Sequence, residues 1–192
     1  MQAIRIIQDE HRSLASVLDG MLYIVRKIRD HGAKPDFDLL GAMVYYLDAF
    51  PERFHHPKED NYLFKLLRAR CPEAHSLLDL LHAEHLAGAE KIRTLEQTLA
   101  RYQQGGDAES VAFIAAVEDY ATFQQQHMGR EEREVLPLAE KHLMAGDWEA
   151  IDAAFVGHTD PLFGESPSED YHKLFQRILN LAPPPIGLGP AR

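Results

Sequence analysis

The sequence predicts an all-α protein: an up-down-up-down four-helix bundle followed by a short helical C-terminal extension. Along four long segments, apolar residues recur in steps of three and four, the spacing of one face of an α-helix. Short stretches rich in glycine and proline separate these segments, so neighbouring helices are expected to run antiparallel. No segment shows the sustained alternation of a half-buried strand. We expect the bundle at residues 1–145, the helical extension at 146–182 and a flexible tail at 183–192.

The first helix is expected over residues 4–28, where the inward positions form an unbroken seam. These positions are Ile4, Ile7, His11, Leu14, Leu18, Met21, Val25 and Ile28. The turn at residues 32–35 contains a glycine and a proline, which end this helix. The second helix is expected to begin at about Asp36.

Two prolines, Pro51 and Pro57, fall inside the second helix. Each removes a backbone N–H donor, and its ring obstructs the carbonyl group one turn earlier. We therefore expect the second helix to be kinked or split around residues 54–60, whose sequence is FHHPKED.

The third helix is expected over about residues 73–103 and the fourth over about 108–144, with a Gly-Gly-Asp turn between them. Both carry apolar residues in steps of three and four. Pro137 is expected to bend the fourth helix. Beyond the bundle, short helices are predicted at 148–156 and 168–181.

Composition excludes several classes of function. The chain has 20 Lys and Arg against 30 Asp and Glu, a formal charge of −10, which argues against binding to nucleic acid. No apolar run approaches the ~20 residues of a membrane span. The first eleven residues, MQAIRIIQDEH, lack the apolar core of a signal peptide. Because Cys71 is the only cysteine, no internal disulfide can form, and we expect a cytoplasmic protein.

Four of the eleven histidines belong to an internal repeat. His11 and His85 each occupy a seam position where Leu or Ile would otherwise fit, and each follows a glutamate. His55 and His127 each begin an H-x-x-x-E motif, in HHPKEDNYLF and HMGREEREVL. His55 lies 44 residues after His11, and His127 lies 42 residues after His85. Each half thus supplies one histidine and then a histidine and a glutamate one turn apart: His11, His55, Glu59, His85, His127 and Glu131.

This repeat predicts a metal site. Residues four apart on a helix point the same way, so the two members of each motif can approach one ion. A buried carboxylate without a partner would cost several kcal/mol, which a divalent cation offsets. Imidazole suits iron, zinc, copper and nickel. We expect two iron ions bridged by Glu59 and Glu131, with the histidines as terminal ligands; zinc or another divalent ion could occupy a purified sample.

The pattern H…HxxxE…H…HxxxE in a four-helix bundle resembles the hemerythrin-like, or HHE cation-binding, family over about residues 1–145. The resemblance implies a non-haem diiron centre. It also implies dioxygen binding, as in some members, or sensing of oxygen, nitric oxide or iron, as in others. Matching the motif residue by residue gives the metal ligands His11, His55, Glu59, His85, His127 and Glu131.

The chain departs from the oxygen-carrying hemerythrins at two places. Those proteins have HxxxH on the third helix, whereas here Ala89 stands four residues after His85. They also have an aspartate five residues after the last histidine, where this chain has Glu132, and Glu131 fits the HxxxE spacing better. One histidine ligand is therefore missing, which weakens the expectation of reversible oxygen transport and leaves redox chemistry open.

Other polar residues lie close to the expected ligands in sequence. His82, three residues before His85, could supply the missing ligand, although a flanking polar role is favoured. His158 could reach over the mouth of the bundle. The remaining neighbours are expected to be solvated, or in some cases to lie behind a ligand and orient it: Glu10, His56, Asp60, Glu84 and Glu132.

Three hypotheses for function follow. The first is a diiron protein that binds or senses a small diatomic ligand, O2 or NO, or iron itself. The second is a diiron enzyme of the peroxidase or oxidase type. Ferritin-like sites use ExxH motifs on two helices and more carboxylates, whereas this chain has HxxxE motifs and a majority of histidines, and nothing outside the metal site looks catalytic. The third is a metal-stabilised regulatory module that binds a second copy or another protein through residues 146–182.

Overall fold

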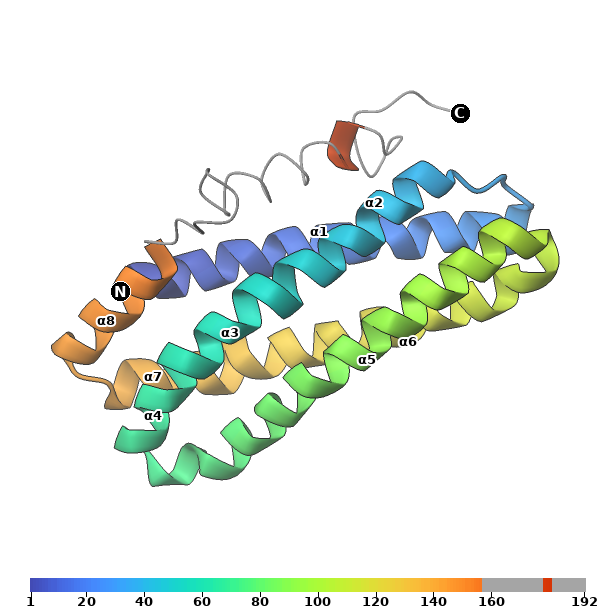
Figure 1. Ribbon diagram of the computed structural model, residues 1–192. Coiled ribbons are helices and arrows are strands. Elements are labelled where there is room, and N and C mark those ends of the chain that lie inside the picture. The colour runs from blue at the N-terminus through green and yellow to red at the C-terminus, as the bar shows by residue number, and fades with distance from the viewer. Residues whose placement is uncertain (157–177, 181–192) are drawn as a thin grey trace.

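The computed structural model describes residues 1–156 and 178–180, and every regular element within these residues is a helix (Figure 1). The prediction of an all-α protein is confirmed for this part of the chain. Four long helical runs are followed by a fifth helix, α8 (Ala145–Val156), at the place of the helix predicted for 148–156. The predicted tail, His158 and all but the end of the predicted helix at 168–181 lie outside the described residues, and the domain boundaries stay predictions.

The first helical run is α1 (Gln2–His31), which ends at the predicted turn. Gly32 has φ 61°, a left-handed conformation that glycine adopts without steric penalty, and its N–H donates to the carbonyl of Ile28 at 3.1 Å. The next helix, α2, begins after Asp36, whose carboxylate accepts a hydrogen bond from the N–H of Leu39 at 3.1 Å.

The second helical run extends without a break over residues 37–70, so the predicted split is wrong. The interruption takes the form of π-helical turns instead. A π turn pairs residues five apart rather than four, and this accommodates the missing donor and the crowded carbonyl of a proline. In order, the run consists of α2 (Phe37–Leu47), π-helical η1 (Asp48–His55), α3 (His56–Lys58), π-helical η2 (Glu59–Phe64) and α4 (Lys65–Arg70).

The other two long runs complete the set. The short 3-10 turn η3 (Pro72–Ala74) leads into α5 (His75–Gly105), and η4 (Gly106–Glu109) leads into the fourth run. That run comprises α6 (Ser110–Arg130), π-helical η5 (Glu131–Val135) and α7 (Leu136–His142), with Pro137 in the first turn of α7. A π turn thus begins at Glu59 in the second run and at Glu131 in the fourth, so the sequence repeat extends to the backbone.

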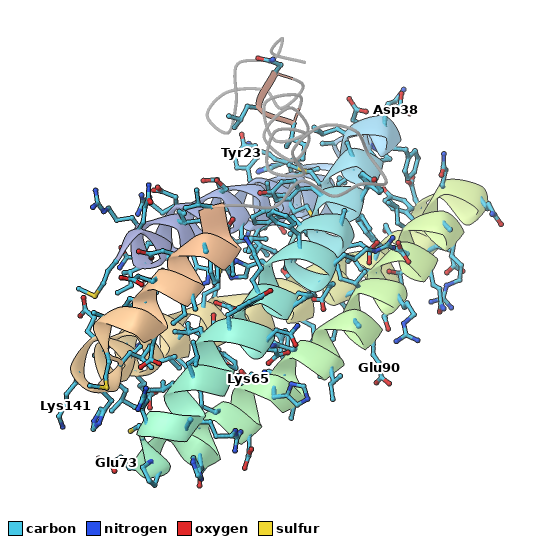
Figure 2. The ribbon with its side chains drawn as sticks, turned by 60° about the vertical axis from the view of Figure 1, so that its left-hand side comes forward. Tyr23, Asp38, Lys65, Glu73, Glu90 and Lys141 are labelled. Atoms are coloured by element: carbon cyan, nitrogen blue, oxygen red, sulfur yellow. The ribbon has the colours of Figure 1, made fainter. Side chains whose placement is uncertain are left out.

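The four long runs lie lengthwise beside one another, and consecutive runs point in opposite directions (Figure 1). Contacts join α1 to α2, α2 to α5, α5 to α6, and α6 back to α1. The fifth helix, α8, packs beside the beginning of α1, where the N–H of Ala3 donates to the Asp152 carboxylate at 2.7 Å. Charged side chains such as Lys65, Glu90 and Lys141 point outward from the helices (Figure 2).

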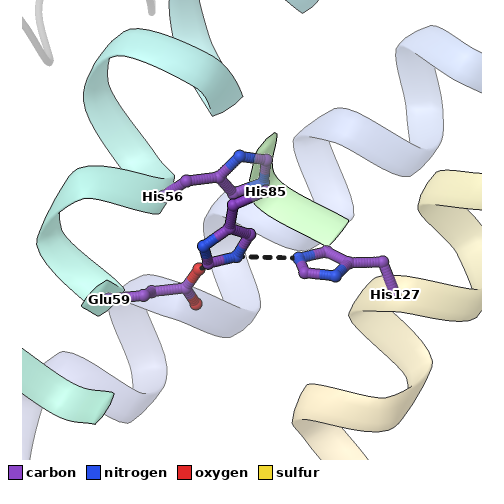
Figure 3. Close-up of side chains that lie close together, drawn as sticks. All are labelled: His56, Glu59, His85 and His127. Carbon is purple, nitrogen blue, oxygen red and sulfur yellow. Dashed lines mark hydrogen bonds and ion pairs between the residues drawn. The ribbon is translucent and has the colours of Figure 1, made fainter. Parts of the chain in front are cut away.

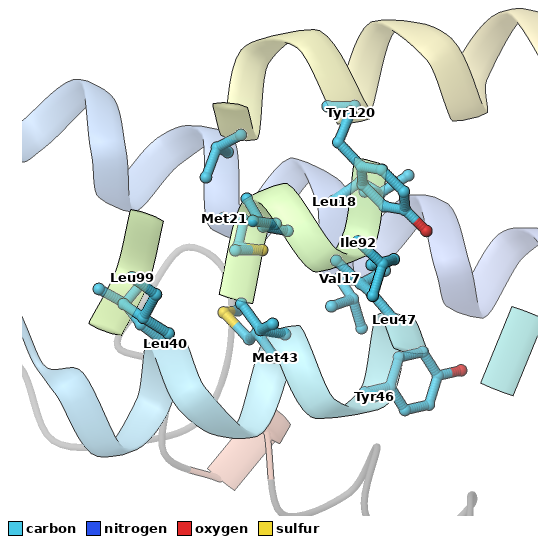
Figure 4. Packing of buried hydrophobic residues seen from close by; sticks show 14 of the residues in the cluster. Val17, Leu18, Met21, Leu40, Met43, Tyr46, Leu47, Ile92, Leu99 and Tyr120 are labelled. Atoms are coloured by element: carbon cyan, nitrogen blue, oxygen red, sulfur yellow. The ribbon is translucent and has the colours of Figure 1, made fainter. Parts of the chain in front are cut away.

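The buried apolar residues form two clusters. The larger, drawn in Figure 4, includes Leu14, Leu18, Met21, Leu40, Met43, Leu47, Ile92, Val117 and Tyr120. The smaller includes Ile7, Leu63, Leu67, Leu78, Leu81, Val135, Leu136, Trp148 and Ile151. Predicted site residues separate the two clusters along each long run: His11 lies between Ile7 and Leu14, for example. The candidate site is therefore a polar layer across the middle of the core.

Among the described residues, no helix is both long enough and apolar enough to cross a bilayer. The cytoplasmic location expected from the single cysteine stays a prediction. Cys71 is buried in the smaller apolar cluster, away from the polar layer.

Candidate metal centre

The structure brings together all six residues that the histidine repeat predicts. Each is at most 5% exposed, although imidazole and carboxylate groups are usually solvated. Ligand atoms fall into two groups in which all atoms lie within 4.8 Å of one another. The first group contains His11, His55, Glu59 and Glu131; the second contains His56, Glu59, His85 and His127 (Figure 3).

The four predicted histidines form two pairs, one from each half of the repeat. The Nε2 atoms of His11 and His55 are 3.1 Å apart, and those of His85 and His127 are also 3.1 Å apart (dashed line in Figure 3). Two imidazole nitrogens at about 2.1 Å from one ion, and at right angles, are roughly 3 Å apart. Each pair therefore already has the separation of two ligands on a common ion.

Each buried carboxylate contacts both histidine pairs. Glu59 places Oε1 at 3.3 Å from Nε2 of His55 and Oε2 at 3.7 Å from Nε2 of His85. Glu131 places Oε2 at 3.4 Å from Nε2 of His11 and Oε1 at 3.3 Å from Nε2 of His127. None of these four buried oxygens has a hydrogen-bond partner within the described part of the chain. Such a donor set fits two cations bridged by two carboxylates, because the cations would neutralise charges that are costly to bury unpaired.

Outside the site, each of the four histidines faces a carboxylate with its Nδ1 atom. Three donate hydrogen bonds of 2.7–3.0 Å: His11 to Glu132, His55 to Glu10 and His127 to Glu84. The fourth, His85, has Nδ1 at 3.1 Å from Oδ2 of Asp60. A proton held on Nδ1 leaves the lone pair of Nε2 directed inward, as a metal ligand requires.

These four contacts, which we call the carboxylate ring, close around the bundle. A carboxylate of each long run contacts a histidine of the next run, and a histidine of each run is contacted by a carboxylate of the run before it. In order, Glu10 of α1 contacts His55, Asp60 of the second run contacts His85, Glu84 of α5 contacts His127, and Glu132 of the fourth run contacts His11.

The prediction that Glu10 and Glu84 face solvent is wrong, since their side chains are only 14% and 12% exposed; that of Glu132 is 41% exposed and still reaches His11. A sequence signal for the ring exists: an acid precedes the first histidine of each half, and another follows each motif glutamate.

A basic residue supports the ring in each half. Lys58 Nζ lies 3.2 Å from Oε1 of Glu10, and Nη1 of Arg130 lies 2.8 Å from Oε1 of Glu84. Both basic residues stand directly before the motif glutamate. Lys58 is only 2% exposed and lies 4.0 Å from the ring centre of Phe54. Burial lowers the pKa of this amine, and the Glu10 carboxylate opposes the shift.

Carboxylates around the histidines favour their protonated forms. Burial alone would lower the pKa of His11, but close contacts with Glu131 and Glu132 outweigh it and raise the pKa to about 10. The same balance between burial and neighbouring carboxylates raises the pKa of His85 to about 9 and that of His127 to about 10. Burial would raise the pKa of Glu131, yet the charge of His127 and contacts with the histidines lower it well below its ordinary value. Cations at this site therefore compete with protons.

Two further histidines lie near the six. His82 has a side chain 56% exposed, and its Nδ1 lies 3.1 Å from Oδ1 of Asp60, so it stands outside His85. His56 was expected either to be solvated or to lie behind a ligand; it is only 4% exposed, which excludes the first alternative. Its ring stacks on that of His85, with centroids 4.1 Å apart and an interplanar angle of 10° (Figure 3). Burial and the nearby charge of His85 lower the pKa of His56 well below its ordinary value.

Replacing His85 and replacing His82 are expected to have very different effects on metal binding. His85→Ala should remove one ion, because Nε2 of His85 contacts both carboxylates of the layer. His82→Ala should weaken binding by at most the ~10–100-fold typical of a residue that acts through a ligand's partner. Iron titration followed by absorbance and metal analysis measures both. Loss of an ion in His82→Ala but not in His85→Ala would contradict this placement.

Comparison with known families agrees with the geometry. The family model described as "Hemerythrin HHE cation binding domain" matches residues 2–139, which include all six residues of the site. No curated protein and no solved structure shows significant similarity to the chain. The matched segment covers most of the chain, and its buried histidines and glutamates are of the kind that bind metal cations. The chain therefore belongs to the hemerythrin family of HHE cation-binding domains.

Proposed function

We propose that this protein holds two iron ions in its polar layer and binds or senses a small diatomic ligand, O2 or NO, at them. One ion would lie at the pair His11 and His55, and the other at the pair His85 and His127. The observation that carries the proposal is the span of the two buried carboxylates. Glu59 and Glu131 each contact both pairs, as bridging ligands of two ions would.

The donor set favours iron. Four imidazoles and two carboxylates suit iron better than magnesium or calcium, which prefer oxygen ligands alone. Zinc and other divalent ions accept the same donors, so a purified sample could contain them. Two iron ions would supply open coordination positions and one-electron redox chemistry. The four histidines direct the lone pairs of their Nε2 atoms inward, and their Nδ1–H groups face the carboxylates of the ring. The two apolar clusters above and below the layer keep water out.

The proposal includes the predicted topology. We infer that the four long helical runs act as an up-down-up-down bundle in which each helix presents ligands at the same height. Two observations support this inference: the runs alternate in direction (Figure 1), and each of the four contributes at least one residue to the polar layer. Association with a second copy or another protein through residues 146–182 stays a prediction.

The test is metal analysis and optical spectroscopy of protein produced with iron. The expected result is about two iron ions per chain and a reversible spectral change when O2 or NO is added to the reduced protein without air. Iron content that stays clearly below two ions per chain under iron-rich expression would contradict the proposal. Rapid turnover of H2O2 or Fe(II) without a reversible spectral change would favour the alternative of a diiron enzyme.

A further inference from the structure

The two halves of the site are not equivalent, although the repeat relates them. Residues of the second and fourth runs correspond at a separation of 72, as His55 and His127 do, and residues of α1 and α5 at a separation of 74, as His11 and His85 do. The correspondence fails at three buried positions next to the polar layer. At the positions of Glu52 and His56 in the first half, the second half has Gln124 and Met128. At the position of Gly88 in the second half, the first half has Leu14.

His56 lies with the second histidine pair. One of its ring nitrogens belongs to the group of ligand atoms within 4.8 Å of one another that also includes Glu59, His85 and His127. The His56 ring stacks on His85 and meets the His127 ring edge to face, with centroids 5.2 Å apart (Figure 3). The corresponding residue in the other half, Met128, is an apolar member of the larger cluster. Among the described residues, the ligand group of His85 and His127 therefore includes a third imidazole, whereas that of His11 and His55 does not.

Glu52 lies on the Nδ1 side of His56, at a longer distance than the carboxylates of the ring, and Nδ1 of His56 has no hydrogen-bond partner among the described residues. Its Oε2 lies 3.5 Å from Nδ1 of His56, and its side chain is only 7% exposed. Oε1 of Glu52 has no hydrogen-bond partner within the part of the chain that the structure describes. A carboxylate in this position can accept a hydrogen bond from Nδ1–H of His56, which leaves the lone pair on Nε2 to bind an ion.

Gly88 provides the space that the Glu52 carboxylate occupies. A Cβ atom at position 88 would lie 2.6 Å from Oε1 of Glu52, which is closer than real Cβ contacts allow. The corresponding residue of α1 is Leu14, a buried side chain of the larger cluster. The carboxylate and the extra histidine come from the first half of the repeat and the glycine from the second, yet they lie together, and each is replaced at its counterpart.

We propose that His56 is a fifth histidine ligand, bound to the ion at His85 and His127, and that Glu52 orients it. This inference rests on the proposed diiron function and makes the two ions unequal, one with three histidines and the other with two. The third histidine of that ion then comes from the second helical run and not from α5.

The experiment compares matched substitutions in the two halves. His56→Met gives position 56 the residue of its counterpart, and Met128→Leu is the control at that counterpart. Iron affinity and Mössbauer spectra of the iron-loaded proteins are measured, with circular dichroism as the check on folding. In the unaltered protein we expect two distinct iron environments. His56→Met should weaken binding of one ion by more than about 100-fold and change one environment, whereas Met128→Leu should keep both.

Two milder variants test the role of Glu52. Glu52→Gln places the residue of its counterpart, Gln124, at position 52, and Gly88→Ala displaces only the end of the flexible Glu52 side chain, so both are expected to fold. Each should weaken the same single ion by ~10–100-fold, the effect typical of a residue that orients a ligand.

Outcomes that overturn the inference are distinct from those that overturn the proposed function. If the His56→Met protein keeps two tightly bound ions in unchanged environments, His56 is not a ligand, while the diiron function stands. Should His56→Met fail to fold, the same result in the two milder variants leads to the same conclusion. Equal environments in the unaltered protein would also overturn the inference. Fewer than two ions in the unaltered protein would instead overturn the diiron function.

Discussion

Glu131→Gln is expected to reduce the iron content from about two ions per chain to one or fewer. The Glu131 carboxylate contacts the first histidine pair through Oε2 and the second through Oε1, so its replacement affects both ions. An amide has no negative charge, and its NH2 group cannot bind a cation. Glu59→Gln should have a similar effect, because Glu59 also contacts both pairs.

The control is Glu134→Gln, an exposed residue in the same π-helical segment, which should keep both ions. Glu84→Gln should lie between the two, with a ~10–100-fold weaker affinity, because Glu84 acts through His127. Metal analysis after dialysis against a weak chelator, together with circular dichroism, measures all of these variants. Equal iron content in Glu131→Gln and Glu134→Gln would exclude Glu131 as a bridge.

Removal of the metal is expected to lower the melting temperature, and by more in alkaline than in acidic solution. In metal-free protein the raised histidine pKa values stabilise the folded state through protonation. That contribution is complete below the unfolded pKa of ~6.5 and is lost as the pH rises through the folded values, about 9 for His85 and about 10 for His11 and His127. Metal binding shows the opposite trend, because an ion must displace these protons.

The expected change in melting temperature follows from the stabilisation that a ligand of the folded state provides. Free metal at about 1,000 times its dissociation constant stabilises the folded state by ~4 kcal/mol. For a chain of this length, each kcal/mol shifts the melting temperature by roughly 2–4 °C, which gives a difference of roughly 8–16 °C at alkaline pH. The difference should shrink as the pH falls through the folded pKa values, about 10 for His11 and His127 and about 9 for His85, because below them protons occupy the ligand nitrogens.

Thermal melts with and without chelator across this pH range test the prediction. Glu131→Gln serves as the control, since a chelator should change its melting temperature much less. A chelator effect that is largest in acid, or absent at slightly alkaline pH, would contradict the linkage.

The sequence predicts the helices, and it predicts the six residues that the structure brings together, because both depend on spacing along a single helix. The seam of α1 continues through His11, and the repeat then identifies the matching positions in the other half. What the sequence reading missed depends on contacts between helices. Glu10 lies beside His11 in the chain but contacts His55 of the next run, and which residues face one another across two helices cannot be read from one helical period.

The placement of His56 was missed for a different reason. In a regular α-helix, adjacent side chains diverge by about 100°, so a residue next to an inward histidine is expected to point away from the site. The second run contains π turns on both sides of His56, and a wider turn separates adjacent side chains by a smaller angle. His55 and His56 are consequently both buried. Pro51 and Pro57 were a signal that the helix departs from the α geometry here, but not of how it would do so.

The carboxylate ring also determines where this chain can vary in length. Apolar seams are not directional, so two helices joined only by leucines can slide past each other by a turn at little cost. A contact between a carboxylate and an imidazole is specific in position, and three of the four in the ring are directional hydrogen bonds. Each long run takes part in two contacts of the ring, which fix both its height and its rotation. The two halves show the result, because 44 residues separate the histidines of one pair and 42 those of the other, yet both pairs meet at 3.1 Å. His11 and His85 each lie 20 residues before the end of their helix, so the surplus falls beyond those ends, between the close of one helix and the histidine of the next. Insertions in the connecting turns should therefore be tolerated. One residue added inside a long helix, in contrast, would rotate the residues after it by about 100° and shift them out of line with their partners on the neighbouring helices.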